Sequence, residues 1–216
     1  MNRVTLFCGH YGSGKSNIAV NYALKIASSG LPVALADIDI VNPYFRSADS
    51  RKELEEAGVT VVSLPFANSN VDLPALPQEV YGLVQRRDIY AVLDVGGDDR
   101  GALALGRYVP YILEENDYEM LFVVNFYRPL TTDAESAFEI LREIESAAGM
   151  RFTGIVNNSN LGGETTADVI EQAVPMAEAL SALSGLPCVM TVYEKRFAGI
   201  VDVGNPFPIR LQHKNF

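Results

Sequence analysis

The sequence predicts an α/β fold, a single domain whose mostly parallel sheet of about seven strands is covered by helices on both faces. Three observations support this prediction. Short, continuously apolar runs alternate with segments of helical spacing along the 216 residues. Unbroken apolar runs are typical of strands that are buried on both faces, as in parallel sheets. Polar residues follow several of these runs directly, where the strands of such a sheet would end.

The first elements are a strand, a helix and a second strand. Val4–Cys8 is apolar apart from one threonine and predicts the first strand. Beyond Lys15, isoleucine and tyrosine side chains recur at every fourth residue, which predicts a helix that ends at Gly30 and Pro32. The second strand is expected at Val33–Ala36.

The same alternation continues toward the carboxyl end. Further helices are expected near residues 47–57 and after Thr132 and Thr165. Glu135 and Asp168 follow these threonines at the spacing of a capping box. No repeat or second-domain boundary interrupts the pattern, so residues 1–216 are predicted to form one domain. The remaining strands are expected at residues 59–63, 90–94, 120–125, 152–157 and 187–192.

A phosphate-loop motif separates the first strand from the first helix. Residues 9–16 read Gly-His-Tyr-Gly-Ser-Gly-Lys-Ser and match G-x-x-x-x-G-K-[ST] in that context. The backbone N–H groups of such a loop point at a polyphosphate, and the helix that follows adds its positive dipole end. Lys15 is expected to reach the outer phosphates and Ser16 to ligate Mg²⁺. The residues predicted to bind nucleotide here are Gly9, Gly12, Ser13, Gly14, Lys15, Ser16 and Asn17.

Polar residues at later strand ends complete the predicted site. Asp94 closes one strand before Val-Gly-Gly and is expected to hold Mg²⁺ through water. Of Asp37 and Asp39, we expect Asp39 to face the phosphates, both as a metal-shell residue and as the catalytic residue that positions the attacking water. Asn157 ends another strand, and its amide offers the donor and acceptor that fit an adenine edge.

Composition limits the range of functions. With 17 basic and 27 acidic side chains the net charge is -10, which argues against direct DNA binding. No stretch approaches the length of about 18 apolar residues that a membrane helix needs, and the start leaves no room for a signal peptide. Cys8 and Cys188 are the only cysteines and form no C-x-x-C metal motif. We therefore expect a cytoplasmic protein.

These motifs resemble a known family. The phosphate loop, Asp37-Ile-Asp39 and Asp94–Gly97 look like those of deviant-Walker P-loop ATPases, the SIMIBI-type NTPase class that contains MinD and ParA. The resemblance covers nearly the whole length and implies ATP and Mg²⁺ bound at a homodimer interface. It also implies slow ATP hydrolysis that acts as a dimerisation switch for a protein partner, which the sequence does not identify. By this resemblance, Lys15 binds the β- and γ-phosphates and Ser16 ligates Mg²⁺. Asp39 positions the attacking water, and Asp94 holds the metal shell. Asn157 reads the adenine.

One departure from the family concerns its signature lysine, five residues before the loop lysine. This chain has His10 there, and a neutral imidazole lacks the fixed charge that the lysine extends across the dimer. Either another cation substitutes, with Arg46 and Arg100 as candidates, or hydrolysis is slow and dimerisation weaker. The segment Asn42–Arg46 has the character of a switch loop, although its aromatic residues fit ordinary packing equally well.

Two other functions remain open at this stage. The chain could be a small-molecule enzyme of the dethiobiotin synthetase or cobyrinate amidation type, with Pro65–Pro77 as its substrate loop. It could also be a nucleotide-binding module with little hydrolysis. The Asn-Lys-x-Asp signature of guanine sites is absent, because residues 157–160 read Asn-Asn-Ser-Asn, and ATP is therefore expected over GTP.

Overall fold

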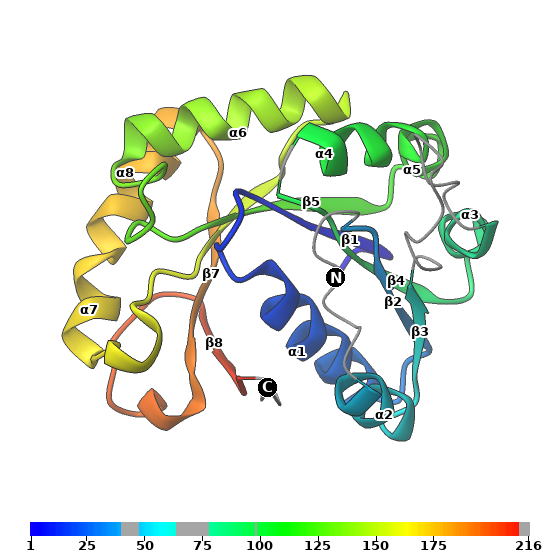
Figure 1. Ribbon diagram of the computed structural model, residues 1–216, viewed down its shortest axis with the longest axis horizontal. Helices are drawn as coiled ribbons and strands as arrows, with labels where there is room; N and C mark the ends of the chain where they lie inside the picture. Colours follow the sequence, from blue (N-terminus) through cyan, green and yellow to red (C-terminus); the bar gives the residue numbers. More distant parts are fainter. Residues whose placement is uncertain (40–47, 64–77, 98, 212–216) are drawn as a thin grey trace.

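The computed structural model of the protein describes residues 1–39, 48–63, 78–97 and 99–211 (Figure 1). The expected switch loop, which includes Arg46, and the expected substrate loop at residues 65–77 lie outside these ranges. Arg100 lies in a described helix, but its side chain is not described.

A single parallel sheet forms the centre of the molecule. Its strands lie in the order β3-β2-β4-β1-β5-β6-β7-β8, and every pairing between these described strands is parallel. Their carboxyl ends therefore share one edge of the sheet. The strands are β1 (Val4–Cys8), β2 (Val33–Asp37), β3 (Val59–Ser63), β4 (Tyr90–Asp94), β5 (Tyr118–Val124), β6 (Gly154–Asn157), β7 (Cys188–Glu194) and β8 (Pro206–Ile209).

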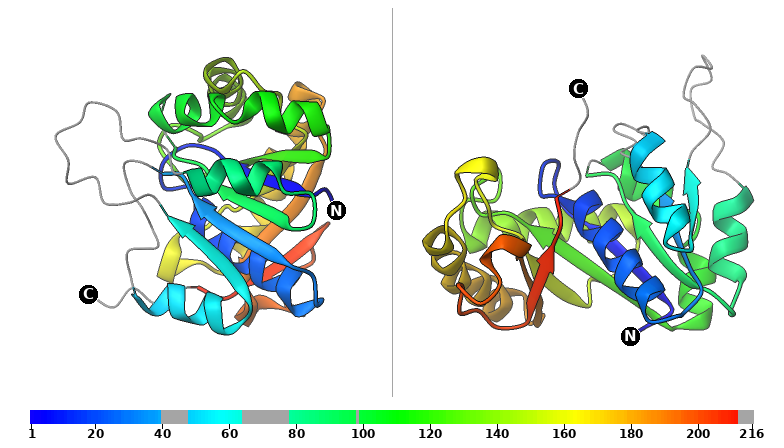
Figure 2. Two further views of the ribbon diagram at one scale, coloured as in Figure 1. Left: turned by 90° about the vertical axis from the view of Figure 1, so that its right-hand side faces the viewer. Right: turned by 90° about the horizontal axis from the view of Figure 1, so that it is seen from below.

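Helices cover both faces of the sheet, as predicted (Figures 1 and 2). One face carries α1 (Lys15–Ser28) and α2 (Ala48–Glu56). A short helix, α7 (Ala167–Gln172), contributes Ile170 to a small cluster beside the end of β7. No described helix is both long and apolar enough to cross a membrane. The other face carries α3 (Gln78–Gln85), α4 (Asp99–Gly106), α5 (Val109–Glu115), α6 (Ala134–Ala148) and α8 (Val174–Ser184).

The buried central strands explain the unbroken apolar runs in the sequence. All residues of β1 and of β2 are buried. Leu6 of β1 packs in the core on one face, and its neighbour Phe7 packs in the core on the other. Because successive side chains of a strand point to opposite faces, both sets must be apolar, and no polar alternation remains.

The sheet has one strand more than the sequence predicted. β8 was missed because Pro206 and Pro208 occupy two of its four positions, and proline weakens a strand pattern. The strand lies at the edge of the sheet, where it pairs with β7, and an edge strand tolerates missing N–H donors. Phe207 and Ile209 alternate with the prolines and are buried. The helices α3, α4 and α5 were also not predicted.

The predicted helix caps are wrong by one residue. Asp133, not Thr132, caps α6, and its carboxylate accepts a hydrogen bond of 2.8 Å from the N–H of Ser136. Thr166, not Thr165, caps α7. Each helix is preceded by two or three consecutive residues of the capping type, so the packing of the helix decides which one is used.

Candidate functional site

The glycine-rich loop leaves β1 at the carboxyl edge of the sheet and packs on the ends of two neighbouring strands. Gly14 has φ of 91°, and a Cβ built there would lie 2.2 Å from Nδ2 of Asn158. A Cβ built at Gly9 would lie 2.2 Å from the carbonyl oxygen of Val123. Glycine is therefore required at both positions, and β5 and β6 fix the shape of the loop.

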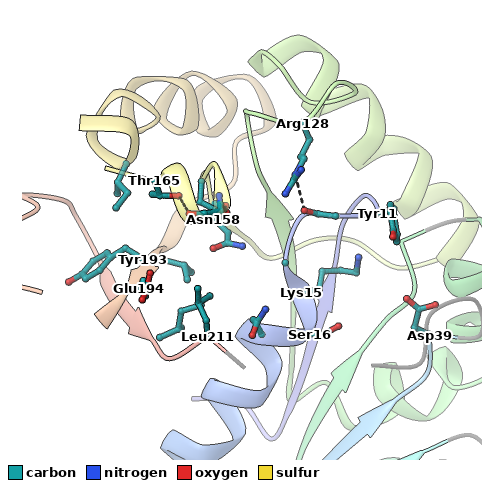
Figure 3. A pocket seen from close by; sticks show the side chains of 18 residues that line it. Tyr11, Lys15, Ser16, Asp39, Arg128, Asn158, Thr165, Tyr193, Glu194 and Leu211 are labelled. Carbon is teal, nitrogen blue, oxygen red and sulfur yellow. Dashed lines mark hydrogen bonds between the residues drawn. The ribbon is translucent and has the colours of Figure 1, made fainter. Parts of the chain in front are cut away.

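A cavity of about 430 Å³ opens beside this loop. Its volume lies within the usual range of small-molecule sites, about 300–1,000 Å³. Figure 3 shows Lys15 and Ser16 at the start of α1 on one side of the cavity, and Tyr193 and Glu194 at the end of β7 on the other. The predicted nucleotide-binding residues that line it are Gly12, Gly14, Lys15, Ser16 and Asn17.

Lys15 is a nearly buried cation in this cavity. Lys15 is 6% exposed, and its Nζ donates a hydrogen bond of 3.3 Å to the carbonyl of His10. A Cβ built at Gly97 would lie 2.9 Å from Nζ, so the glycine leaves the room that the ammonium occupies. A charge held out of water in this way is stabilised by an anionic ligand.

Asp94 lies beneath the loop as a buried carboxylate. Neither of its oxygens, nor the Oγ of Ser13, has a hydrogen-bond partner of ordinary geometry among the described residues. Burial raises the pKa of Asp94 to about 6, while the charge of Lys15 and the Ser16 hydroxyl partly oppose this shift. Unpartnered buried polar atoms are rare in folded proteins and often mark a place that a ligand or ion fills.

Asp39 reaches the same cavity from the end of β2. It is buried and lines the cavity, whereas the carboxylate of Asp37 accepts a hydrogen bond of 3.0 Å from the backbone N–H of Asp39. A Cβ built at Gly96 would lie 3.2 Å from Oδ1 of Asp39, so the segment after β4 closes on this carboxylate. Asp39 and not Asp37 therefore faces the cavity.

The donor set is compatible with Mg²⁺. Among the described residues no three His, Cys, Asp or Glu side chains are placed to hold a metal by themselves. Mg²⁺ does not need such a cluster, because it keeps several waters and takes one or two protein oxygens together with phosphate oxygens. The Ser16 hydroxyl and the unpartnered Asp94 carboxylate are oxygen ligands of the required kind.

Asn157, which the sequence predicts at an adenine edge, does not line the cavity. Its Oδ1 accepts hydrogen bonds from the N–H and the hydroxyl of Ser159, at 3.2 and 2.7 Å. Its Nδ2 points to the carbonyl of Ala173 at 3.5 Å, and the residue is buried. The Asn157 side chain thus shapes the turn after β6, while the next residues, Asn158 and Asn160, line the cavity.

Two contributors to the site were missed from the sequence. Asn158 donates a hydrogen bond of 2.6 Å to the carbonyl of Ser13 and so supports the phosphate loop. Arg128, from the loop after β5, donates from Nε to the carbonyl of Gly12 at 3.1 Å (Figure 3). Both belong to polar clusters that follow strands, residues 125–128 and 157–160, and this was the available signal. The strand order that puts β5 beside β1 was not readable from the sequence.

Comparisons with known proteins identify the fold. Neither protein-family models nor curated protein sequences match this chain. Among solved structures, signal recognition particle receptor FtsY from Elizabethkingia anophelis matches 88% of the chain with a TM-score of 0.53 and 19% identity. FtsY from Mycoplasma mycoides matches 87% with a TM-score of 0.56 and 19% identity.

A third similar structure is the signal recognition particle 54 kDa protein from Aeropyrum pernix K1 in complex with GDP, with a TM-score of 0.52 and 18% identity over 87% of this chain. The chain covers 58% of each of the two FtsY chains and 40% of the 54 kDa protein. At such low identity the likeness concerns the fold. The chain therefore has the α/β fold of P-loop NTPases, with an eight-stranded parallel sheet between two layers of helices.

Proposed function

We propose that this chain binds ATP with Mg²⁺ in the cavity beside the phosphate loop and hydrolyses the nucleotide slowly. One observation carries the proposal: the buried Lys15 ammonium lines the cavity beside the phosphate loop, and the Asp94 carboxylate, buried close to it, has no hydrogen-bond partner of ordinary geometry among the described residues. An isolated domain would gain nothing from such an arrangement, whereas a bound triphosphate and cation would neutralise both charges.

Each side chain has a role in the proposed site. The loop N–H groups and Lys15 would bind the phosphates. Ser16 and Asp94 would hold the Mg²⁺, which when bound neutralises charge on the phosphate oxygens. Asp39 would orient the attacking water. That water attacks the γ-phosphorus, and the bond between the γ-phosphorus and the oxygen that bridges to the β-phosphate breaks. Inorganic phosphate and ADP leave.

The preference for ATP over GTP rests on residues 157–160. A guanine site of the Asn-Lys-x-Asp type uses an aspartate as its last residue, and this chain has Asn160, which lines the cavity. The carboxylate of Glu194 also lines the cavity but forms an ion pair of 2.7 Å with Arg196. Competition between ATP and GTP in a melting assay tests this preference, and a clear advantage of GTP would overturn it.

The proposed biological role is a switch in which ATP controls association with a second copy of the chain or with a protein partner. The resemblance to the MinD and ParA class supports this role, as does exposed apolar surface near the cavity, including Tyr11 at 65% exposure. An ATP-dependent change in hydrodynamic mass tests it. Binding without phosphate release would indicate a binding module instead.

The central prediction concerns Lys15. At about a hundredfold excess over Kd, ATP·Mg²⁺ should stabilise the wild type by about 2.7 kcal/mol. Lys15→Ala should abolish this stabilisation, because it removes the buried phosphate-binding charge. Thermal unfolding with and without nucleotide measures the effect.

Lys52→Ala is the matched control, because Lys52 is exposed on α2 and pairs with Glu56. It should retain the full shift. A shift that survives in Lys15→Ala would show that the phosphate loop is not the binding site.

A further inference from the structure

The phosphate loop lacks a cation at the position where similar ATPases carry their signature lysine. His10 stands there, and its Nδ1 lies 3.0 Å from the carbonyl oxygen of Tyr11. A histidine side chain does not carry the permanent positive charge that a lysine would offer to a polyphosphate. The candidates expected from the sequence, Arg46 and Arg100, have no described side chain.

Arg128 is a described cation at the rim of the cavity. Figure 3 shows its side chain extending from the loop after β5 to the phosphate loop, and it lines the cavity together with Lys15. Its Nε donates to the carbonyl of Gly12 at 3.1 Å. A Cβ built at Gly12 would lie 3.7 Å from Nε, which places the guanidinium in van der Waals contact with the loop.

The backbone around Arg128 is held by a tight turn. The N–H of Arg128 donates to the carbonyl of Asn125 at 3.1 Å, and the Thr131 hydroxyl donates to the same carbonyl at 2.7 Å. Asn125 is buried, and its Oδ1 accepts a hydrogen bond of 3.0 Å from the N–H of Tyr127. The arginine therefore extends from an ordered base, although its own side chain is exposed.

The two terminal nitrogens of this guanidinium have no partner among the described residues. Several other arginines of this acidic chain form ion pairs, among them Arg3 with Glu115, and both Arg142 and Arg151 with Glu145. Arg128 uses Nε alone and keeps its remaining N–H donors beside the cavity. Guanidinium donors in a fixed plane suit phosphate oxygens, and one arginine can bind a carbonyl and a phosphate at the same time.

We propose that Arg128 is a phosphate-binding residue that supplies, from within the same subunit, the positive charge missing at His10. This inference rests on the proposed nucleotide site and extends it to a residue that the phosphate-loop motif does not include. Through Nε the arginine holds the Gly12 carbonyl, and through its terminal nitrogens it donates to the polyphosphate.

Calorimetric titration of ATP·Mg²⁺ into wild type, Arg128→Ala and Arg128→Lys tests the proposal. Loss of a charge-assisted hydrogen bond should weaken binding by about ten- to a hundredfold in Arg128→Ala. Arg128→Lys should bind with intermediate affinity, because it keeps the charge without the planar donors. Arg87→Ala removes the same charge from an exposed position just before β4, at the opposite edge of the sheet, and should bind as the wild type does.

Inorganic tripolyphosphate is the probe that separates a phosphate contact from other effects. If Arg128 binds phosphate, Arg128→Ala should lose the same factor in affinity for tripolyphosphate as for ATP. Melting of the nucleotide-free variant provides a second check. A drop of more than about 4 °C, larger than loss of the single hydrogen bond to Gly12 explains, would mean that the arginine acts through the fold of the loop and not through a phosphate contact, and the proposal would be wrong.

The outcomes distinguish a failure of the role proposed for Arg128 from a failure of the proposed nucleotide site. Arg128→Ala that binds ATP and tripolyphosphate within twofold of wild type, while Lys15→Ala does not bind, overturns the role of Arg128 and leaves the nucleotide site standing. A wild type that binds no nucleotide, or a Lys15→Ala variant that binds normally, overturns the proposed function and this inference with it.

Discussion

The amino and carboxyl edges of the sheet differ in how their buried polar groups are partnered. At the amino edge, Arg3 pairs with Glu115 and donates to the carbonyls of Leu83, Val84 and Ile89. At the carboxyl edge, three of the four buried side-chain atoms that lack a hydrogen-bond partner in the described chain belong to Ser13 and Asp94.

The difference separates an edge that satisfies its buried polar groups internally from an edge that leaves several of them without a partner among the described residues. Thr5 and Tyr22 both donate to Oε1 of Glu119, at 2.9 and 2.8 Å, so the amino edge satisfies its polar groups internally. The carboxyl edge leaves comparable groups unsatisfied at a cost in stability. Such a cost is expected where bound phosphate and Mg²⁺ would supply the missing partners.

Among these substitutions, Arg3→Ala should change the free energy of unfolding the most. It removes one partner of a buried ion pair and leaves the Glu115 carboxylate and several carbonyls without a donor. The free energy of unfolding should fall by about 3–5 kcal/mol, as measured by urea denaturation.

Arg86→Ala is its control, because Arg86 forms an exposed pair with Asp88 near the same edge. That variant should unfold at nearly the same urea concentration as the wild type, because solvent screens an exposed ion pair. If Arg3→Ala lowered the free energy of unfolding no more than Arg86→Ala, the polar contacts at the amino edge would not stabilise the fold.

Asp94→Asn should raise the free energy of unfolding, whereas Arg3→Ala lowers it. Because burial raises the folded-state pKa of Asp94 from 3.8 to about 6, its contribution to stability is present at low pH and is lost as pH rises toward 6. Removing the charge should therefore stabilise the nucleotide-free protein by about 1–3 kcal/mol above that pH.

This gain should disappear below about pH 4, where wild-type Asp94 is protonated in both the folded and the unfolded state. Urea denaturation at several pH values measures it. The same variant should lose the Mg²⁺ dependence of nucleotide binding. A variant that is destabilised above pH 6 would show that the carboxylate is partnered in the free protein.

Removal of one hydroxyl group at each edge tests the same difference through smaller changes in stability. Thr5→Val should cost about 1 kcal/mol, because the hydroxyl donates to Glu119, whereas Ser13→Ala should cost close to zero, because its hydroxyl has no partner. Thermal unfolding of the nucleotide-free variants measures both. Equal costs would remove the distinction between the two edges.

Much of the fold was readable from the sequence because the determinants are local. Unbroken apolar runs gave seven of the eight strands, and the motif at residues 9–16 gave the phosphate loop. The missed strand, β8, is specified by its pairing with β7 and by the burial of Phe207, neither of which leaves a local pattern.

The site was readable only where a motif spans it. Lys15, Ser16 and Asp39 line the cavity, whereas the Asn157 side chain turns into the protein and Asn158 lines the cavity instead. Arg128 was given no role at the phosphate loop, because its position there depends on β5 lying beside β1, although these strands are separated by β2, β3 and β4 in the chain. Contacts of that kind are fixed by topology and not by neighbouring residues.

The packing of the phosphate loop has a consequence for biosynthesis. Ser13 is translated 145 positions before Asn158, the residue that supports its carbonyl, and the loop also rests on Val123. A ribosome therefore makes the loop near the start of translation, yet its shape depends on strands that emerge much later. Capacity to hold a triphosphate would arise only when the nascent chain has extended past the sixth strand, so ligand binding would report that assembly of the sheet has reached that point.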